Sequence, residues 1–381
     1  MINLSVPSMY DEKYLVKLNE LNCKSTNDTY ITEVYGSLPN APVGTIRPSI
    51  TLPQVSIEYI KDYIKLSAKY NMNFNYIMNS TVLDGSEYIK EDRKKIVEFV
   101  KTLTDAGLTR ITITVPFIVK LVKKYFPDLN ITASICSEVD SVKRAIDFEE
   151  LGVNCIVLAK DVNRDFALIE QINKNFKGEI KLLATTPCIY KCSDLFYHMN
   201  LSSVRDNELQ NAFKIKGKFI SHTAIRCQRR RLENLDEYIK SPWIRPEDMD
   251  YYENIGIHNF KLDGRDRSME YNLDVIEAYM NKSFDGNLLY LMQNYYPKNY
   301  AEMERLSNPS DDFWRLGVFL DNKKLDGFIK RFAEKKFDCN DSCENCKYCN
   351  MWLNKCISLN KENTDRYLNV LKKKDDEILA I

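Results

Sequence analysis

The 381-residue sequence has no surplus of either charge, because 54 lysine and arginine residues balance 54 aspartate and glutamate residues. Overall charge therefore gives no electrostatic argument for a nucleic acid or an anionic membrane as a partner. No apolar run approaches the ~18 residues of a membrane-spanning helix. The first residues, MINLSVPSMYDEKY, contain no basic segment followed by an apolar one, so no signal peptide is expected. We expect a cytoplasmic protein without a membrane partner.

Familiar hydrolase motifs are also missing. The sequence contains no HExxH zinc motif, no GxSxG nucleophile elbow and no evident Cys–His pairing. Its eleven cysteines are an odd number in a long chain, which argues against a secreted disulfide scaffold. A reducing compartment with metal-bound thiolates fits this composition better.

Short apolar, β-rich runs alternate with longer amphipathic runs, as in βαβ units. We predict strands at roughly 2–7, 30–36, 73–79, 110–115, 129–136, 154–159, 180–186 and 257–262. Helical faces are predicted in 55–70, 92–107 and 139–152, and the last two stop at glycine. Eight repeats predict a TIM-like (β/α)8 barrel; an open doubly wound sheet is the alternative, because periodicity cannot show closure.

The regular alternation of predicted strands and helices stops at about residue 281. Residues 1–281 are predicted to form the barrel, and residues 282–381 a mostly helical extension with a Cys-rich metal loop at 339–356. The spacing before the last strand is unusually long, and the insertion at about 187–240 fills it. Long insertions at the catalytic face of a barrel are usually functional.

The Cys-rich loop gives the strongest metal signal. It reads DCNDSCENCKYCNMWLNKC, and Cys339, Cys343, Cys346 and Cys349 follow one another at spacings of three, two and two intervening residues. One compact run of this kind is typical of an iron–sulfur loop, whereas structural zinc sites commonly use two CxxC pairs well apart. We predict a [4Fe–4S] cluster on these four thiols; zinc, or unligated or redox-paired cysteines, are the alternatives.

A second group of thiols is expected at the barrel mouth. Cys188 and Cys192 follow a predicted strand, Cys227 lies later in the same insertion, and Cys136 ends the strand 129–136. Since carboxyl ends of barrel strands meet at one face, these thiols could converge there on a metal. The alternative for Cys136 is a small buried hydrophobe, which free cysteine often is.

Polar groups at the same face suggest an anion site. Lys261, Asp263 and Arg265 lie at the end of the last strand and could bind a carboxylate or phosphate, or instead form an ion-pair network that closes the barrel. The predicted substrate-binding set is Arg245, Asp263, Arg265, Asn163 and Arg164, and the predicted catalytic groups are His198, Glu33 and Lys261.

The segment that contains Arg245, Lys261, Asp263 and Arg265 resembles a known family. The segment IRPEDMDYYENIGIHNFKLDGR resembles the signature of the U32 collagenase-like peptidase family, in which a similar stretch ends in K-hydrophobic-[DE]-G-R. VYGSLPN, LAKDVNRDFALIEQI and PCIYKC, followed by His198, resemble further segments of that family. The resemblance spans about residues 1–280.

Better-understood members are oxygen-independent hydroxylation proteins that act on tRNA uridine, ribosomal RNA cytidine or ubiquinone precursors. The resemblance implies a barrel that holds a [4Fe–4S] cluster through four cysteines near its mouth, with prephenate as oxygen donor. In this sequence Cys188, Cys192 and Cys227 match that region, and Cys136 is the choice for the fourth ligand.

The expected function is therefore an iron–sulfur hydroxylation, or a related redox modification, of a small molecule, RNA or peptide. An electron-donor protein and a second U32-like subunit are the expected protein partners. Two alternatives stay open: a U32-type peptidase or other hydrolase, and a non-catalytic iron–sulfur subunit of a heterodimer.

Overall fold

Eight parallel strands close into a barrel in the order β1-β10-β7-β6-β5-β4-β3-β2. This computed structural model describes residues 1–203, 214–215, 218–219, 221–292, 316–334, 339 and 343–380. The barrel strands are β1 (Ile2–Pro7), β2 (Thr29–Gly36), β3 (Asn73–Met78), β4 (Arg110–Ile113), β5 (Asn130–Ala133), β6 (Cys155–Val157), β7 (Glu179–Leu183) and β10 (Asn259–Lys261). The closure confirms the predicted TIM-like barrel and excludes the open sheet.

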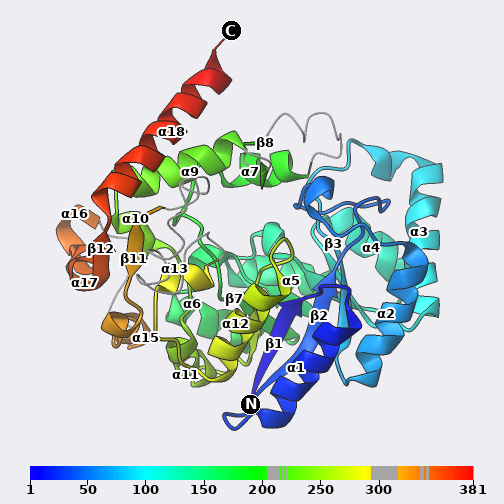
Figure 1. The fold of residues 1–381 in the computed structure, drawn as a ribbon. Helices are drawn as coiled ribbons and strands as arrows, with labels where there is room; N and C mark the ends of the chain where they lie inside the picture. Colours follow the sequence, from blue (N-terminus) through cyan, green and yellow to red (C-terminus); the bar gives the residue numbers. More distant parts are fainter. Residues whose placement is uncertain are drawn as a thin grey trace.

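Helices cover the outside of the barrel (Figure 1). They are α1 (Glu12–Lys24), α2 (Ile57–Lys69), α3 (Lys90–Asp105), α4 (Pro116–Tyr125), α5 (Val142–Glu150), α6 (Phe166–Asn175), α11 (Met249–Glu253) and α12 (Met269–Met280). Short 3₁₀ turns lie in the connecting loops: η1 (Ser49–Thr51), η2 (Ser86–Tyr88), η3 (Ile135–Ser137), η4 (Lys160–Val162) and η5 (Pro246–Asp248). No helix in the described ranges is both long and apolar enough to cross a membrane.

Local sequence explains where the outer helices begin and end. The Ser56 side chain caps α2 by accepting a hydrogen bond from the Tyr59 amide, and α2 buries Ile60 and Ile64 against the barrel. Helix α3 ends just before Gly107, whose φ of 101° is a conformation that glycine adopts without strain. The predicted helices are thus present, with boundaries shifted by one to three residues.

Several strands are shorter than predicted. The strand expected at 129–136 ends at Ala133, because the Ser134 side chain accepts a hydrogen bond from the Cys136 amide and turns the chain into η3. Cys136 therefore lies in a 3₁₀ turn just beyond the strand rather than at its end. The strand expected at 257–262 pairs only over Asn259–Lys261.

The insertion before β10 lies across the carboxyl ends of the barrel strands (Figure 1). It contains α7 (Leu195–Ser202), the two short strands β8 (Lys214–Ile215) and β9 (Lys218–Phe219), α9 (His222–Glu233) and α10 (Asp236–Lys240). The run Gln228 to Arg231, the one basic cluster that the sequence offers for phosphate contacts, is part of α9. Its arginines are partly used within the protein, since Arg231 is 2% exposed and Arg229 pairs with Asp375.

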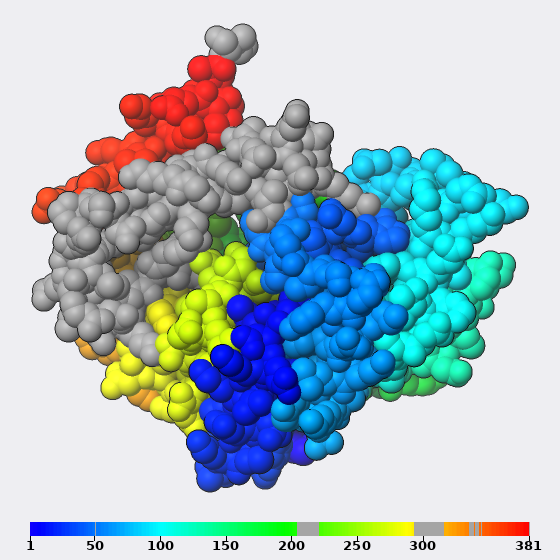
Figure 2. Space-filling view, turned by 45° about the vertical axis from the view of Figure 1, so that its right-hand side comes forward, coloured from blue at the N-terminus to red at the C-terminus, as the bar shows by residue number. Residues whose placement is uncertain are grey.

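The C-terminal extension is mostly helical, as predicted. Its elements are α13 (Leu288–Leu291), β11 (Val318–Leu320), η7 (Lys323–Leu325), α15 (Lys330–Ala333), α16 (Cys343–Cys346), α17 (Tyr348–Cys356), β12 (Ile357–Leu359) and α18 (Lys361–Leu379). Helix α18 packs along α9, where Asp375 Oδ1 lies 3.1 Å from His222 Nε2. In the space-filling view its red end projects beyond the rest of the described surface (Figure 2).

The barrel interior carries charged side chains instead of the branched apolar residues that usually dominate it. Glu33 on β2 accepts a hydrogen bond of 2.8 Å from Lys181 Nζ on β7. Because β2 and β7 are not neighbours in the barrel, these side chains meet across its interior. Burial alone would raise the pKa of Glu33, but Lys181 and Lys261 lower it to about 2. Glu33 is thus a permanent carboxylate below the mouth.

Candidate active site

Lys261, the last residue of β10, lies in a cationic part of the barrel mouth. Its Nζ is 3.8 Å from the centre of the Tyr35 ring, and the Arg265 guanidinium lies 5.9 Å from the same ring. Burial and the positive charges of Lys181 and Arg265 lower the pKa of Lys261 to about 7. The side chain is only partly exposed. Strand β10 therefore ends on an amine that loses its proton close to neutral pH.

Arg265 is 8% exposed and has few partners for its guanidinium. Its Nη1 donates to Ser37 Oγ at 3.2 Å, while its buried Nε has no hydrogen-bond partner among the described residues. Burial and the neighbouring Arg47 lower the pKa of Arg265. Asp263, which could have neutralised it, forms an ion pair with Arg47 instead. The mouth beside Lys261 thus holds a buried cation with unused hydrogen-bonding capacity.

The turn that carries these groups depends on Gly264. Its φ is +155°, and a Cβ at this position would collide with the Asn272 side-chain oxygen. The Asn272 amide in turn donates to the Gly264 carbonyl at 3.1 Å. The glycine of the KLDGR stretch is therefore needed for close approach of α12 to the mouth.

We expect Gly264→Ala to lower the free energy of unfolding by about 1–3 kcal/mol, because it adds a steric collision to backbone strain. Urea titration measures the loss. Gly85→Ala is the matched control, since Gly85 has a φ of +76° but nothing lies within 4 Å of an added Cβ. Equal losses in the two variants would contradict the close-approach argument.

Two of the predicted thiol ligands meet at the mouth from distant parts of the insertion. Cys188 follows β7, and Cys227 lies on α9. Burial raises the pKa of the Cys188 thiol; the positive charge of Lys160 opposes that shift, and the Cys227 thiol adds to it. A thiolate at Cys188 would thus be stabilised by Lys160 and by the Arg231 charge.

Cys136 lies in a different polar environment. It is 7% exposed, and its Sγ is 3.9 Å from Asn79 Nδ2. Burial raises the pKa of Cys136 to about 12, and the strongest charges on it come from Glu138, Arg265 and Lys261. Cys136 therefore faces the cationic groups of the mouth.

Cys192 is partly exposed in the loop before α7. All cysteines of the described residues are free of disulfides.

The four thiols of the C-terminal loop lie close enough to influence one another. Burial raises the pKa of Cys339 to about 11, Arg164 opposes this shift, and Cys349, Cys343 and Cys346 add to it. Cys356 lies apart, buried, with its Sγ donating to the Leu353 carbonyl at 3.6 Å. The loop thus presents four thiols near one another, Arg164 lies close to Cys339 and Cys349, and Cys356 is separate from them.

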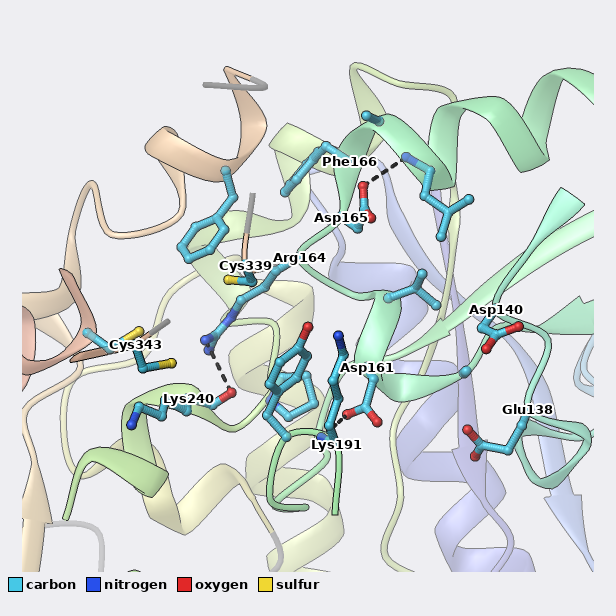
Figure 3. Close-up of a pocket in the computed structure, with 18 residues that line it drawn as sticks. Glu138, Asp140, Asp161, Arg164, Asp165, Phe166, Lys191, Lys240, Cys339 and Cys343 are labelled. Atoms are coloured by element: carbon cyan, nitrogen blue, oxygen red, sulfur yellow. Dashed lines mark hydrogen bonds between the residues drawn. The ribbon is translucent and has the colours of Figure 1, made fainter. Parts of the chain in front are cut away.

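A cavity of about 690 Å³ joins the C-terminal loop to the barrel loops after β5 and β6. Cys339 and Cys343 line one side, and Glu138 and Asp140 line the other (Figure 3); Cys349 is a further lining residue. Burial raises the pKa of Glu138 to about 7, with Lys160 opposing this shift. The cavity therefore brings thiols of the C-terminal loop and charged side chains of the barrel loops to one space.

Arg164 stands at the wall between the cavity and the extension. Its Nη1 donates to the Ile239 carbonyl at 2.7 Å, and its guanidinium lies 4.6 Å from the Trp243 ring and 4.9 Å from the Phe328 ring. Figure 3 shows it beside Cys339 and the Lys240 backbone. The predicted substrate residue Arg164 thus contacts the Cys-rich loop.

The donor chemistry of both cysteine groups fits an iron–sulfur cluster, which thiolates hold. Cys339 lies near the other three thiols of the loop, and Cys188 lies near Cys227 at the mouth. In the described ranges, no three His, Cys, Asp or Glu side chains are gathered closely enough to hold a metal ion. The ligand sets at both places stay predictions.

Other predicted site residues have structural partners. Arg245 is 1% exposed and forms a two-point ion pair with Asp248, so its guanidinium lies inside the protein. Asn163 Nδ2 donates to the Leu183 and Pro242 carbonyls at 2.9 and 2.7 Å. His198 lies exposed on α7. The catalytic role of His198 and the substrate roles of Arg245 and Asn163 stay predictions.

Sequence reasoning did not select Arg47, Tyr35, Lys160 or Glu138 as site residues. Tyr35, Lys160 and Glu138 lie at or just beyond carboxyl ends of strands, so the position itself was the available signal. Arg47 lies in the long loop after β2 and reaches Asp263 across the mouth. Nothing in the sequence around Arg47 indicates that contact.

The sequence is similar to known proteins over most of its length. The sequence model of peptidase family U32 matches residues 33–313. The uncharacterized protease MJ1657 of Methanocaldococcus jannaschii is 27% identical over 364 residues, which are 94% of this chain and 99% of that protein.

Two solved structures are also similar. The U32 peptidase Mk0906 has a TM-score of 0.44 and 14% identity, covering 57% of this chain and 80% of its own. The copper homeostasis protein CutC of Streptococcus agalactiae has a TM-score of 0.33 and 14% identity, covering 54% and 96%.

Proposed function

This chain belongs to peptidase family U32, and on that premise we propose that it is an iron–sulfur enzyme catalysing an oxygen-independent hydroxylation or a related redox modification. The observation that supports the proposal is that Cys188 and Cys227, from distant parts of the insertion, lie close enough for Cys227 to affect the pKa of Cys188. The charge of Lys160 opposes the rise in the pKa of Cys188 that burial causes. The substrate is a small molecule, RNA or peptide in the reducing cytoplasm.

The proposed cluster at the mouth is held by Cys188, Cys192, Cys227 and Cys136, and a second one by Cys339, Cys343, Cys346 and Cys349. A bound [4Fe–4S] cluster supplies electron transfer and, where an iron is left open, Lewis acidity. Zinc is the alternative for the C-terminal loop. An electron-donor protein or a second U32-like subunit is the proposed partner.

The chain's own residues have separate tasks in this proposal. Arg265 binds an acidic group of the substrate or oxygen donor, because its buried guanidinium has unused donors. Arg164 stabilises negative charge on the loop cysteines, as its opposing influence on the pKa of Cys339 and Cys349 indicates. The insertion across the strand ends limits the access of water.

The test is the iron and acid-labile sulfide content of protein purified without oxygen. Because two [4Fe–4S] clusters are proposed, we expect Cys188→Ala/Cys192→Ala and Cys343→Ala/Cys346→Ala each to lose roughly half of the iron and sulfide of the wild type. Cys23→Ala is the control, since Cys23 is exposed on α1. A colourless wild-type protein with stoichiometric zinc would contradict the proposal.

A peptidase is the second candidate, favoured by the family name and by the relative's description as a protease. Such an enzyme needs a nucleophile–base pair or a water-activating metal. Among the described residues, none of the three histidines is hydrogen-bonded to a cysteine or serine side chain; His222 and His258 lie near Asp375 and Glu253. Peptide cleavage that survives Cys188→Ala/Cys192→Ala would favour this candidate.

A further inference from the structure

The amine of Lys261 has an environment that a structural lysine rarely has. A buried lysine is normally paired with a carboxylate, as Lys181 is with Glu33 at 2.8 Å. Lys261 Nζ makes no hydrogen bond or ion pair with any described residue, and its close contact is the face of the Tyr35 ring at 3.8 Å. The side chain is nevertheless partly exposed, so a small molecule can reach it.

The charges around Lys261 favour the neutral amine. Lys181 on β7 and Arg265 beyond β10 repel its proton, whereas Glu33 on β2 and Asp263 beyond β10 attract it. Burial and the two cations outweigh the carboxylates and lower the pKa of Lys261 to about 7. At neutral pH its unprotonated fraction is therefore about 10³ times that of an ordinary lysine. Desolvation beside another cation is a recognised way to make lysine a nucleophile.

A neutral amine does not bind anions well, but its neighbour does. The Arg265 guanidinium lies 5.9 Å from the centre of the ring that Lys261 Nζ contacts at 3.8 Å, so both groups lie beside the same Tyr35 ring. Arg265 Nε is buried without a partner and Nη1 is engaged only by Ser37. A planar guanidinium with free donors matches the two oxygens of a carboxylate.

We propose that Lys261 forms an imine with a small 2-oxo acid whose carboxylate is bound by Arg265. The Nζ lone pair adds to the carbonyl carbon, and a proton passes from nitrogen to the carbonyl oxygen to give a carbinolamine. Loss of that oxygen as water gives the C=N bond. One water is released and no electrons are transferred. The inference rests on the barrel mouth being the active site, but not on a bound cluster.

Reductive trapping tests the imine. The full-length protein is incubated with pyruvate and cyanoborohydride, digested, and mapped by mass spectrometry. We expect the main adduct on Lys261, with a labelling rate that rises around pH 7, and far less label on exposed lysines such as Lys101. Absence of a Lys261 adduct, or label spread evenly over exposed lysines, overturns the proposal.

Two further comparisons test the carboxylate contact of Arg265 and the independence of the imine from a cluster. Acetone lacks the carboxylate. Arg265→Gln should reduce labelling by both probes, because the Arg265 charge lowers the pKa of Lys261, and should reduce labelling by pyruvate about tenfold more than labelling by acetone, as expected for a lost charge-assisted contact. An equal loss for both probes would contradict the carboxylate role. Labelling of Lys261 that persists in Cys188→Ala/Cys192→Ala shows that the imine is independent of the iron–sulfur proposal, and its loss there would overturn that independence.

Discussion

Replacing Lys181 by methionine should lower the free energy of unfolding by about 3–5 kcal/mol, because it leaves Glu33 charged and unpaired inside the barrel. Glu33 is 3% exposed, and Lys181 Nζ lies 2.8 Å from its Oε1. Arg110 also forms an ion pair with this carboxylate, at 3.8 Å from Oε2, and is too distant to replace the lost hydrogen bond. Urea titration at pH 7 measures the loss.

The Glu33–Lys181 pair also predicts how the free energy of unfolding falls at low pH. Lys181 and Lys261 outweigh the effect of burial and lower the pKa of Glu33 from 4.5 to about 2 in the folded protein. A carboxyl group with a lowered folded-state pKa contributes its stability above its unfolded pKa. That contribution is lost as the pH falls from about 4.5 to about 2, and we expect this step to be absent in Lys181→Met.

Two controls distinguish the buried pair from ordinary surface charge. Lys101→Met removes an exposed partner of Asp105 and should cost less than about 1 kcal/mol. The double variant Glu33→Leu/Lys181→Met removes both buried charges and should recover most of the stability lost in Lys181→Met. A double variant as unstable as Lys181→Met would mean that the damage is steric.

The fold could be predicted from the sequence because apolar residues repeat at different spacings in its strands and in its helices. Ile60 and Ile64 repeat at helical spacing, while the short apolar runs between helices mark strands buried on both sides. Strand ends were less accessible, since the Ser134 side chain ends β5 through a local hydrogen bond. Secondary-structure propensity does not detect a single side chain whose hydrogen bond to the backbone replaces a hydrogen bond between two strands.

The candidate site was accessible only in part. The carboxyl ends of strands placed Lys261, Cys188 and Asp263 at one face of the barrel, because barrel geometry fixes where those ends lie. Arg164 follows β6 by the same rule, yet its guanidinium contacts Trp243 and Phe328, which come from distant segments. Such partners depend on how the insertion and the extension pack, and no local pattern encodes that packing.

The second large loss in the free energy of unfolding is expected at the junction between the barrel and the extension. Arg245 lies just before η5 and is 1% exposed. Its Nε and Nη2 donate to Asp248 at 2.9 and 2.8 Å, and its Nη1 donates to the Asn322 carbonyl of the extension at 2.7 Å. Arg245→Met should cost about 3–5 kcal/mol, because Asp248 is then buried without its partner.

Limited proteolysis adds a readout specific to this junction. Arg245→Met removes a direct hydrogen bond to the extension, so we expect cleavage within 316–380 to become faster than in the wild type. Asp326→Ala is the matched control: Asp326 lies 3.1 Å from Arg245 Nη1 but is 65% exposed, so its loss should cost less than about 1 kcal/mol and leave cleavage unchanged. If Asp326→Ala were as damaging as Arg245→Met, the exposed contact rather than the buried Asp248 pair would hold the extension to the barrel.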